Sequence, residues 1–135
     1  MTDTLTTDQH VAIFRSTMVA MVRRDGPDLS ARQLAVFLTC YIHDYPHTVR
    51  GLAATLNVSK PAITRALDRL AELDLARRKI DPLDRRSVIV QRTLKGTALL
   101  RDLRTIVAAA ARPSDGGRGM PTVGRPTHEA AAAAN

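Results

Sequence analysis

The chain has 135 residues, enough for one domain with a hydrophobic core of ordinary size. Its formal net charge is +7 and most of its 20 basic residues are arginine, which predicts affinity for a polyanion such as nucleic acid, although a high-GC genome rich in arginine codons would give the same bias. The single cysteine, Cys40, excludes an internal disulfide framework, and no apolar run of 18 residues predicts a membrane span. The polar N-terminus does not resemble a signal peptide, so we expect a cytoplasmic protein.

Two helices are expected in the first third of the chain. The first begins near Thr7 and runs to about Arg24, with apolar side chains on one face: Val11, Phe14, Met18, Met21 and Val22. The Asp-Gly-Pro sequence at 25–27 ends it. The second helix begins at Ser30, where Gln33 completes a capping box. Four of its side chains share one face: Leu34, Phe37, Leu38 and Tyr41.

Residues 48–74 predict two short helices separated by a tight turn. Thr48 can cap the first helix, and Ser59 can cap the second, which has a proline in its first turn. The second helix carries an apolar stripe at helical spacing: Ile63, Ala66, Leu67, Leu70 and Leu73. A rotation of about 100° per residue puts the following side chains opposite that stripe: Pro61, Thr64, Arg65 and Asp68. This pattern predicts a helix-turn-helix whose recognition helix, 59–74, enters a DNA major groove.

Beyond residue 74 the hydrophobic period becomes that of strands, and two short runs around a turn predict a β-hairpin over 76–92. Residues 76–95 hold seven basic and two acidic side chains. A cationic hairpin after a helix-turn-helix is typical of the wing of a winged helix, which reaches phosphates or a minor groove. Thr93 then caps a last helix, from about Leu94 to Ala111, with a stripe of Leu99, Leu103, Ile106 and Val107.

We therefore predict a mainly α protein. A winged helix-turn-helix domain of about five helices and a hairpin wing occupies residues 1–112, with flanking N- and C-terminal helices for dimerisation. Residues 113–135 are rich in glycine and proline, end in an alanine run and contain few core formers. This composition predicts a disordered tail.

Three stretches resemble the MarR family of winged-helix transcriptional regulators: LSARQLAVFLTC, HTVRGLAATLNVSKPAITRALDRL and DPLDRRSVIVQRTLKG. They cover about Leu29 to Gly96, and the order S-x-P-x-x-T-R, D-x-x-D-x-R and T-x-x-G is fairly specific. The resemblance implies a homodimer with interlocked terminal helices, in which each subunit places a recognition helix and a wing on one half-site of a near-palindrome. Such dimers use a long C-terminal helical region, whereas here the periodicity stops near Ala111, so a smaller interface or a dimer assembled on DNA stays open.

The resemblance also implies roles for individual side chains. Base and phosphate contacts fall to Ser59, Lys60, Thr64 and Arg65, and a minor-groove contact at the wing tip falls to Arg86. Asp84 is expected to shape the wing turn, while Arg85 and Arg50 are more general phosphate candidates. Arg69 is equally compatible with a phosphate contact and with an intrahelical pair to Glu72. The full predicted DNA-binding set is Thr48, Arg50, Ser59, Lys60, Pro61, Thr64, Arg65, Arg69, Asp84, Arg85 and Arg86.

Three further groups of residues each allow more than one role. Asp68 would repel phosphate, which suggests that only the first two turns of the recognition helix lie deep in the groove. His43, Asp44 and His47 could bind zinc together with His10, but the first and third of these flank a proline in a predicted loop and need not converge, so no metal site is predicted. Cys40 could be an oxidation sensor, yet its sequence neighbours include no cation, which favours a packed core thiol.

These observations favour a sequence-specific regulator that binds double-stranded DNA, and we predict a repressor. No enzyme is expected, because the sequence lacks a recognisable nucleophile motif and a glycine-rich phosphate loop. No cofactor or membrane partner is predicted, and the sequence does not identify a small-molecule effector. The alternative is a protein-interaction module, or a cofactor of another regulator, without direct base readout. Its recognition face would be apolar, and Pro61 and Ala62 offer some apolar surface, but the arginine-rich wing argues against it.

Overall fold

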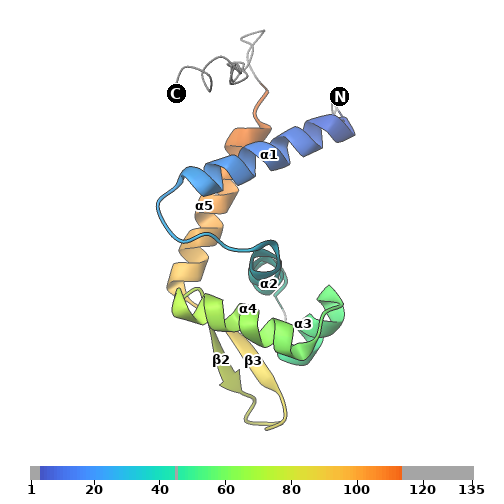
Figure 1. Cartoon of the computed structure of the whole chain (residues 1–135), viewed down its shortest axis with the longest axis vertical. Coiled ribbons are helices and arrows are strands. Elements are labelled where there is room, and N and C mark those ends of the chain that lie inside the picture. The colour runs from blue at the N-terminus through green and yellow to red at the C-terminus, as the bar shows by residue number, and fades with distance from the viewer. Residues whose placement is uncertain (1–3, 45, 114–135) are drawn as a thin grey trace, which may run out of the picture.

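The computed structural model describes residues 4–44 and 46–113; the predicted tail, apart from Pro113, lies outside the described residues. The described part contains five helices and three strands: α1 (Thr7–Arg23), α2 (Ala31–Ile42), β1 (His47–Thr48), α3 (Val49–Leu56), α4 (Lys60–Glu72), β2 (Ala76–Ile80), β3 (Val88–Arg92) and α5 (Leu94–Ala111). The predicted fold class, mainly α with a winged helix-turn-helix, is confirmed (Figure 1).

Each helix begins at a serine or threonine whose side chain accepts a hydrogen bond from the amide three residues further on. These caps are Thr6, Ser30, Thr48, Ser59 and Thr93. The capping box of Ser30 and Gln33 is formed, with hydrogen bonds of 2.9 and 3.1 Å. Asn57, in the left-handed conformation with φ of 53°, ends α3 and makes the tight turn before α4. Local side-chain chemistry therefore fixes the spacing of the helix-turn-helix.

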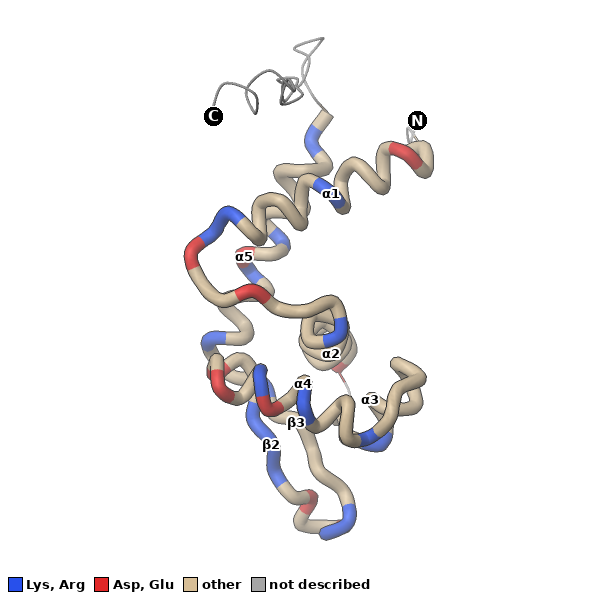
Figure 2. Tube along the Cα trace, viewed as in Figure 1, with Lys and Arg blue, Asp and Glu red and all other residues tan. Residues whose placement is uncertain are grey.

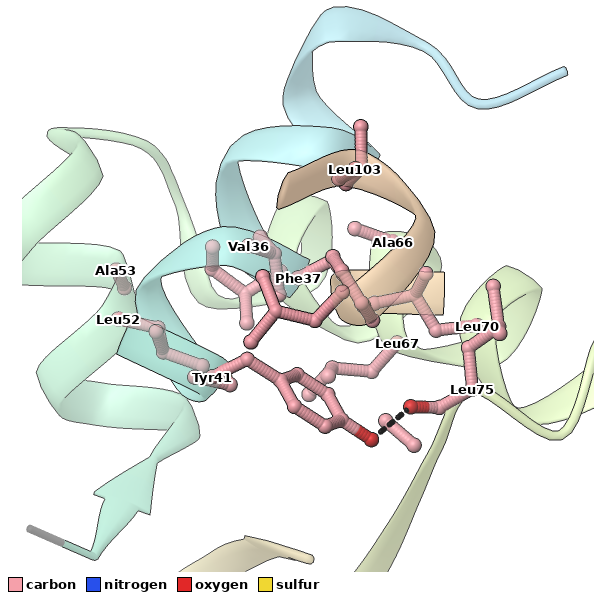
Figure 3. Packing of buried hydrophobic residues seen from close by; sticks show 14 residues of the cluster. Val36, Phe37, Tyr41, Leu52, Ala53, Ala66, Leu67, Leu70, Leu75 and Leu103 are labelled. Atoms are coloured by element: carbon pink, nitrogen blue, oxygen red, sulfur yellow. Dashed lines mark hydrogen bonds between the residues drawn. The ribbon is translucent and has the colours of Figure 1, made fainter. Parts of the chain in front are cut away.

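The core of the winged helix lies around α2 and α4 (Figure 3). Phe37 and Leu67 are almost completely buried, together with Val36 and Cys40, which lie outside the face predicted for α2. The extra burial follows from the position of α2, which packs against α4, α5 and β3. The Tyr41 side chain closes the core at the root of the hairpin, where its hydroxyl donates a hydrogen bond to the Leu75 carbonyl oxygen.

The sheet has the strand order β1-β3-β2 and is antiparallel throughout. The hairpin of β2 and β3 is the predicted wing. The third strand, β1, was expected to be part of a loop, and that expectation is wrong: His47 pairs with Val90, and Thr48 pairs with Ile89. Because β1 has only two residues, it is too short to produce the alternation by which strands are recognised in a sequence.

Helix α1 crosses α5 at the end of the molecule opposite the hairpin (Figure 1). The apolar stripe predicted for α1 is largely uncovered within one chain, since Val11, Phe14 and Val22 are 59%, 66% and 66% exposed. In α5 the buried side chains include Leu100 and Leu103, whereas Val107, assigned to the predicted stripe, is 42% exposed. The two terminal helices thus leave apolar surface that the described part of the chain does not cover. None of the described helices is both long and apolar enough to cross a membrane.

Candidate nucleic-acid interface

The exposed face of α4 is formed by the side chains that the periodicity places opposite its apolar stripe. The inner face of the helix is buried through Ala62, Ile63, Ala66, Leu67 and Leu70. On the outer face, Pro61, Arg65 and Asp68 are exposed, and Thr64 is half-buried. Ala62 is only 6% exposed, so it does not contribute to the apolar outer surface that a protein-interaction module would need. The outer face is therefore polar and cationic near its start.

A cavity of about 310 Å³ lies beside this face, between the starts of α3 and α4 and the hairpin. Four cationic side chains from different elements line it: Arg50, Lys60, Arg78 and Arg86. Hydroxyl groups of Thr48, Thr64 and Ser87 share the lining, together with Val49 and Val88, and no carboxylate is among the lining residues. Guanidinium, ammonium and hydroxyl donors in this combination can bind a phosphate group. We call this space the cationic cavity.

The cationic cavity brings together five of the predicted DNA-binding residues: Thr48, Arg50, Lys60, Thr64 and Arg86. The other six do not line it: Ser59, Pro61, Arg65, Arg69, Asp84 and Arg85. Ser59 caps α4 by accepting a hydrogen bond from the Ala62 amide at 3.2 Å. Of the two possibilities left open for Arg69, the intrahelical pair is formed, with Nη1 at 3.2 Å from Glu72 Oε2.

The hairpin turn is held by two aspartates. The Asp84 carboxylate accepts hydrogen bonds from the Arg86 amide at 3.1 Å and from Ser87 Oγ at 3.3 Å. Asp81 accepts a hydrogen bond from the Leu83 amide at 2.9 Å. This turn holds Arg85 and Arg86 in exposed positions at the tip of the wing, and Figure 2 shows cationic residues along β2 and at this tip. Asp84 thus shapes the turn, as expected.

Arg78 was predicted only as one of the hairpin cations, and the structure places it in the lining of the cationic cavity. Strand alternation puts Ala76, Arg78 and Ile80 on one face of β2, and Ala76 is buried against the core, so this face turns towards α4. Arg78 Nη2 lies 2.5 Å from Oδ1 of Asp68. The expectation that Asp68 repels phosphate did not take this partner cation into account. The period of two along β2 was the signal that could have identified Arg78.

His47 and Cys40, the candidates for a metal site and for an oxidation sensor, are both buried within the fold. His47 is buried in β1, with Nε2 at 3.2 Å from the His43 carbonyl oxygen. Within residues 4–44 and 46–113, no group of three or more metal-ligating side chains is close enough to hold a metal ion. Cys40 is 3% exposed, and burial raises the pKa of its thiol to about 11, while the nearby charge of Arg92 acts in the opposite direction. The expectation of a packed core thiol is confirmed.

A larger cavity, of about 520 Å³, lies between α1, α2, the end of α4 and α5. Its walls are mostly aliphatic, with Met18, Leu34 and Leu99 among them, and its rim carries an ion pair of 2.8 Å between Arg24 and Asp102. This space differs from the cationic cavity in the sign of its charges, because Asp25, Asp28 and Asp102 are among its lining residues, whereas no carboxylate lines the cationic cavity.

Comparison with known proteins relates this site to one family of regulators. The model of the MarR family matches residues 27–87, which include α2, the helix-turn-helix and the hairpin turn. The winged helix of this chain is similar to that of the MarR family. The prediction based on the three sequence stretches is confirmed, whereas no curated protein has a significant match to the chain.

Solved structures of MarR regulators share the fold. A MarR-like transcriptional regulator from Thermotoga maritima is 21% identical, with 80% of this chain and 79% of that chain covered and a TM-score of 0.56. A MarR-family regulator from Rhodococcus sp. RHA1 is 26% identical, with 76% and 67% covered and a TM-score of 0.56. MepR of S. aureus, solved as a complex with DNA, is 18% identical, with 76% and 79% covered and a TM-score of 0.60.

Proposed function

We propose that this protein is a transcriptional repressor of the MarR type that binds double-stranded DNA in a sequence-specific manner. The observation that carries the proposal is the convergence of four cations and three hydroxyls in the cationic cavity, beside an exposed polar face of α4. These groups come from elements as far apart in the sequence as α3 and the hairpin, so the fold and not a local run of charge assembles them. The solved complex of MepR with DNA supports the same class of ligand.

In the proposed complex the first turns of α4 enter the major groove. Thr64 and Arg65 face the base edges, and Arg65 can make a bidentate contact to guanine. Arg50 and Lys60 contact phosphates at the groove edge, where the cationic cavity opens. The hairpin lies alongside, with Arg86 in the minor groove and Arg85 on the backbone. Phosphate contacts set the affinity, and α4 supplies the base preference.

We also propose a homodimer that is formed through α1 and α5. The support is the uncovered apolar stripe of α1, where Phe14 is 66% exposed, next to the exposed Val107 of α5. A two-fold symmetric pair would cover both surfaces and present two copies of α4 to a near-palindromic site. Such a regulator acts on the chromosome in the cytoplasm and needs no catalytic activity.

The test is a binding experiment with the full chain on fragments of the parent genome, followed by a titration of the selected duplex and a scrambled duplex. Arg65→Ala should lose about 1–3 kcal/mol on the selected duplex and less on the scrambled one. Arg86→Ala should weaken both to a similar extent, and Arg104→Ala, on the exposed surface of α5, should change neither. Affinity should fall steeply with salt because several phosphates are neutralised.

Two results would contradict this proposal. Equal losses on the two duplexes for Arg65→Ala would refute direct readout by α4. A folded wild-type protein that binds no genomic fragment at physiological salt would refute DNA binding altogether.

A further inference from the structure

Arg78 connects the recognition helix to the wing. Its Nη2 donates a hydrogen bond to Oδ1 of Asp68 on α4, and its side chain also lines the cationic cavity beside Lys60 and Thr64. Among the ion pairs of the described residues, this is the one that joins α4 to β2. The two side chains are 31% and 50% exposed, so the pair adds little to the free energy of folding. Its position, at the edge of the site, suggests another role.

The chemistry of a guanidinium allows two partners at once. The group is planar and carries five N–H donors, and Asp68 engages Nη2. Arg78 can therefore hold the carboxylate with one edge and present its other donors to the cavity. Asp68 does not line the cavity. Its charge is balanced by Arg78 instead of facing an incoming phosphate alone.

Two neighbouring ion pairs provide a comparison. Arg69 and Glu72 pair within α4 at 3.2 Å, and Arg77 pairs at 3.3 Å with Asp74, in the turn before β2. None of these four residues lines the cationic cavity. Arg77 precedes Arg78 in β2, and strand alternation turns its side chain to the other face. All three pairs are ion pairs, so what distinguishes the pair of Asp68 and Arg78 is that Arg78 lines the cationic cavity.

We propose that Arg78 binds a DNA backbone phosphate in the cationic cavity and that Asp68 is a positioning residue that orients Arg78. The inference rests on the proposed DNA-binding function and adds two residues to its site. It has an unusual consequence for an acidic side chain on a DNA-facing helix. Neutralising Asp68 makes the protein more positive, yet it should weaken binding because Arg78 loses its fixed orientation.

The test uses the full chain and a labelled 30-base-pair duplex of random sequence, because phosphate contacts do not depend on sequence. Arg78→Ala should reduce the affinity about tenfold and lower the slope of log affinity against log salt by about one, whereas Arg77→Ala should have a clearly smaller effect on both. Asp68→Asn should reduce the affinity about threefold, and Glu72→Gln, the same change of charge on α4, should not reduce it. The double variant Asp68→Asn/Arg78→Ala should bind no more weakly than Arg78→Ala alone.

The outcomes separate this inference from the proposed function. If the folded wild type does not bind the duplex, DNA binding itself fails. If the wild type binds but Asp68→Asn binds as well as or better than Glu72→Gln, Asp68 does not position Arg78. If Arg78→Ala behaves like Arg77→Ala, Arg78 is not a phosphate ligand. Thermal unfolding followed by circular dichroism shows whether each variant is folded, and Arg78→Lys, which keeps the charge without the planar fork, should recover part of the affinity.

Discussion

The hydroxyl of Tyr41 occupies the space into which a Cβ atom at position 96 would project. This hydroxyl donates a hydrogen bond to the Leu75 carbonyl oxygen at 2.7 Å and accepts one from the Thr93 amide at 2.9 Å. The tyrosine of α2 thus ties together both ends of the hairpin and the start of α5. Gly96, in the first turn of α5, is required because the tyrosine comes so close to the helix backbone.

Gly96→Ala should destabilise the fold, although alanine normally favours helices. The added Cβ would overlap the Tyr41 ring and would lie 2.5 Å from the Leu75 carbonyl oxygen, so the backbone or the tyrosine must move. We expect a loss of about 1–3 kcal/mol in the free energy of unfolding, measured by urea denaturation. Thr97→Ala, at the next and exposed position, is the control and should stay within about 0.5 kcal/mol. A Gly96→Ala protein as stable as this control would show that the close approach is not required.

Tyr41→Phe should also destabilise the protein, for a different reason. The substitution leaves the buried Leu75 carbonyl and the Thr93 amide without their partner, while the ring keeps its contact with Phe37 at a centroid distance of 4.5 Å. The expected cost is about 1–3 kcal/mol in the free energy of unfolding. Thr39→Ala, which removes an exposed hydroxyl on the same helix, should cost much less. Equal stability of the two variants would mean that water replaces the tyrosine hydroxyl without loss.

Cys40 should be unreactive in the folded protein. Burial raises the pKa of its thiol from the ordinary value of 9.0 to about 11, so little thiolate is present at pH 8 and solvent does not reach it. Reaction with a chromogenic disulfide such as Ellman's reagent should be far slower in buffer than in urea. A native rate close to that of the unfolded chain would show that the thiol is accessible.

The same pKa shift predicts a pH dependence of stability. The folded state holds the thiol proton more tightly than the unfolded state, so this stabilisation is complete below pH 9 and is lost as the pH rises towards 11. The loss amounts to about 2–3 kcal/mol. Urea denaturation of the wild type and of Cys40→Ala between pH 8 and 11 isolates the cysteine contribution from that of other titrating groups. Parallel curves for the two proteins would contradict the prediction.

Phe14→Glu should dissociate the proposed dimer. A charge in the middle of the exposed stripe of α1 cannot be buried against a second copy without a large desolvation cost. Sedimentation equilibrium should show a dimer for the wild type and a folded monomer for the variant. Leu94→Glu introduces the same charge at another exposed apolar position, at the hairpin end of α5, and should leave the dimer intact. A wild type that is monomeric at all concentrations would refute association through α1 in the absence of DNA.

Much of the fold could be predicted because its signals are local. Ser30 and Ser59 mark helix starts by the hydrogen bonds that their own side chains accept, and the change of hydrophobic period after residue 74 marks the hairpin. By contrast, β1 is too short to have a period, and Val36, outside the predicted face of α2, is buried through contacts of that helix with several elements at once. Such burial is a property of the tertiary arrangement.

One part of the candidate site could also be predicted from the sequence, and another part could not. The motif around Thr64 and Arg65 is contiguous, and its position opposite the apolar stripe follows from helical geometry alone. The pairing of Asp68 with Arg78 joins a helix to a strand and depends on how the hairpin packs against α4, which the sequence pattern did not specify. The stripe of α1 was correctly identified as apolar, but the sequence could not show that no other described element covers Phe14.

Thr93 is the single residue between the end of β3 and the start of α5, so the wing is attached to the long helix without a flexible linker. With 18 residues, α5 behaves as a rod of about 27 Å. In a dimer held at the far end of this rod, a small change in its tilt would swing the hairpin through a proportionally larger arc. The separation of the two DNA half-sites would then depend on one helix angle, because no loop at the joint can absorb the change.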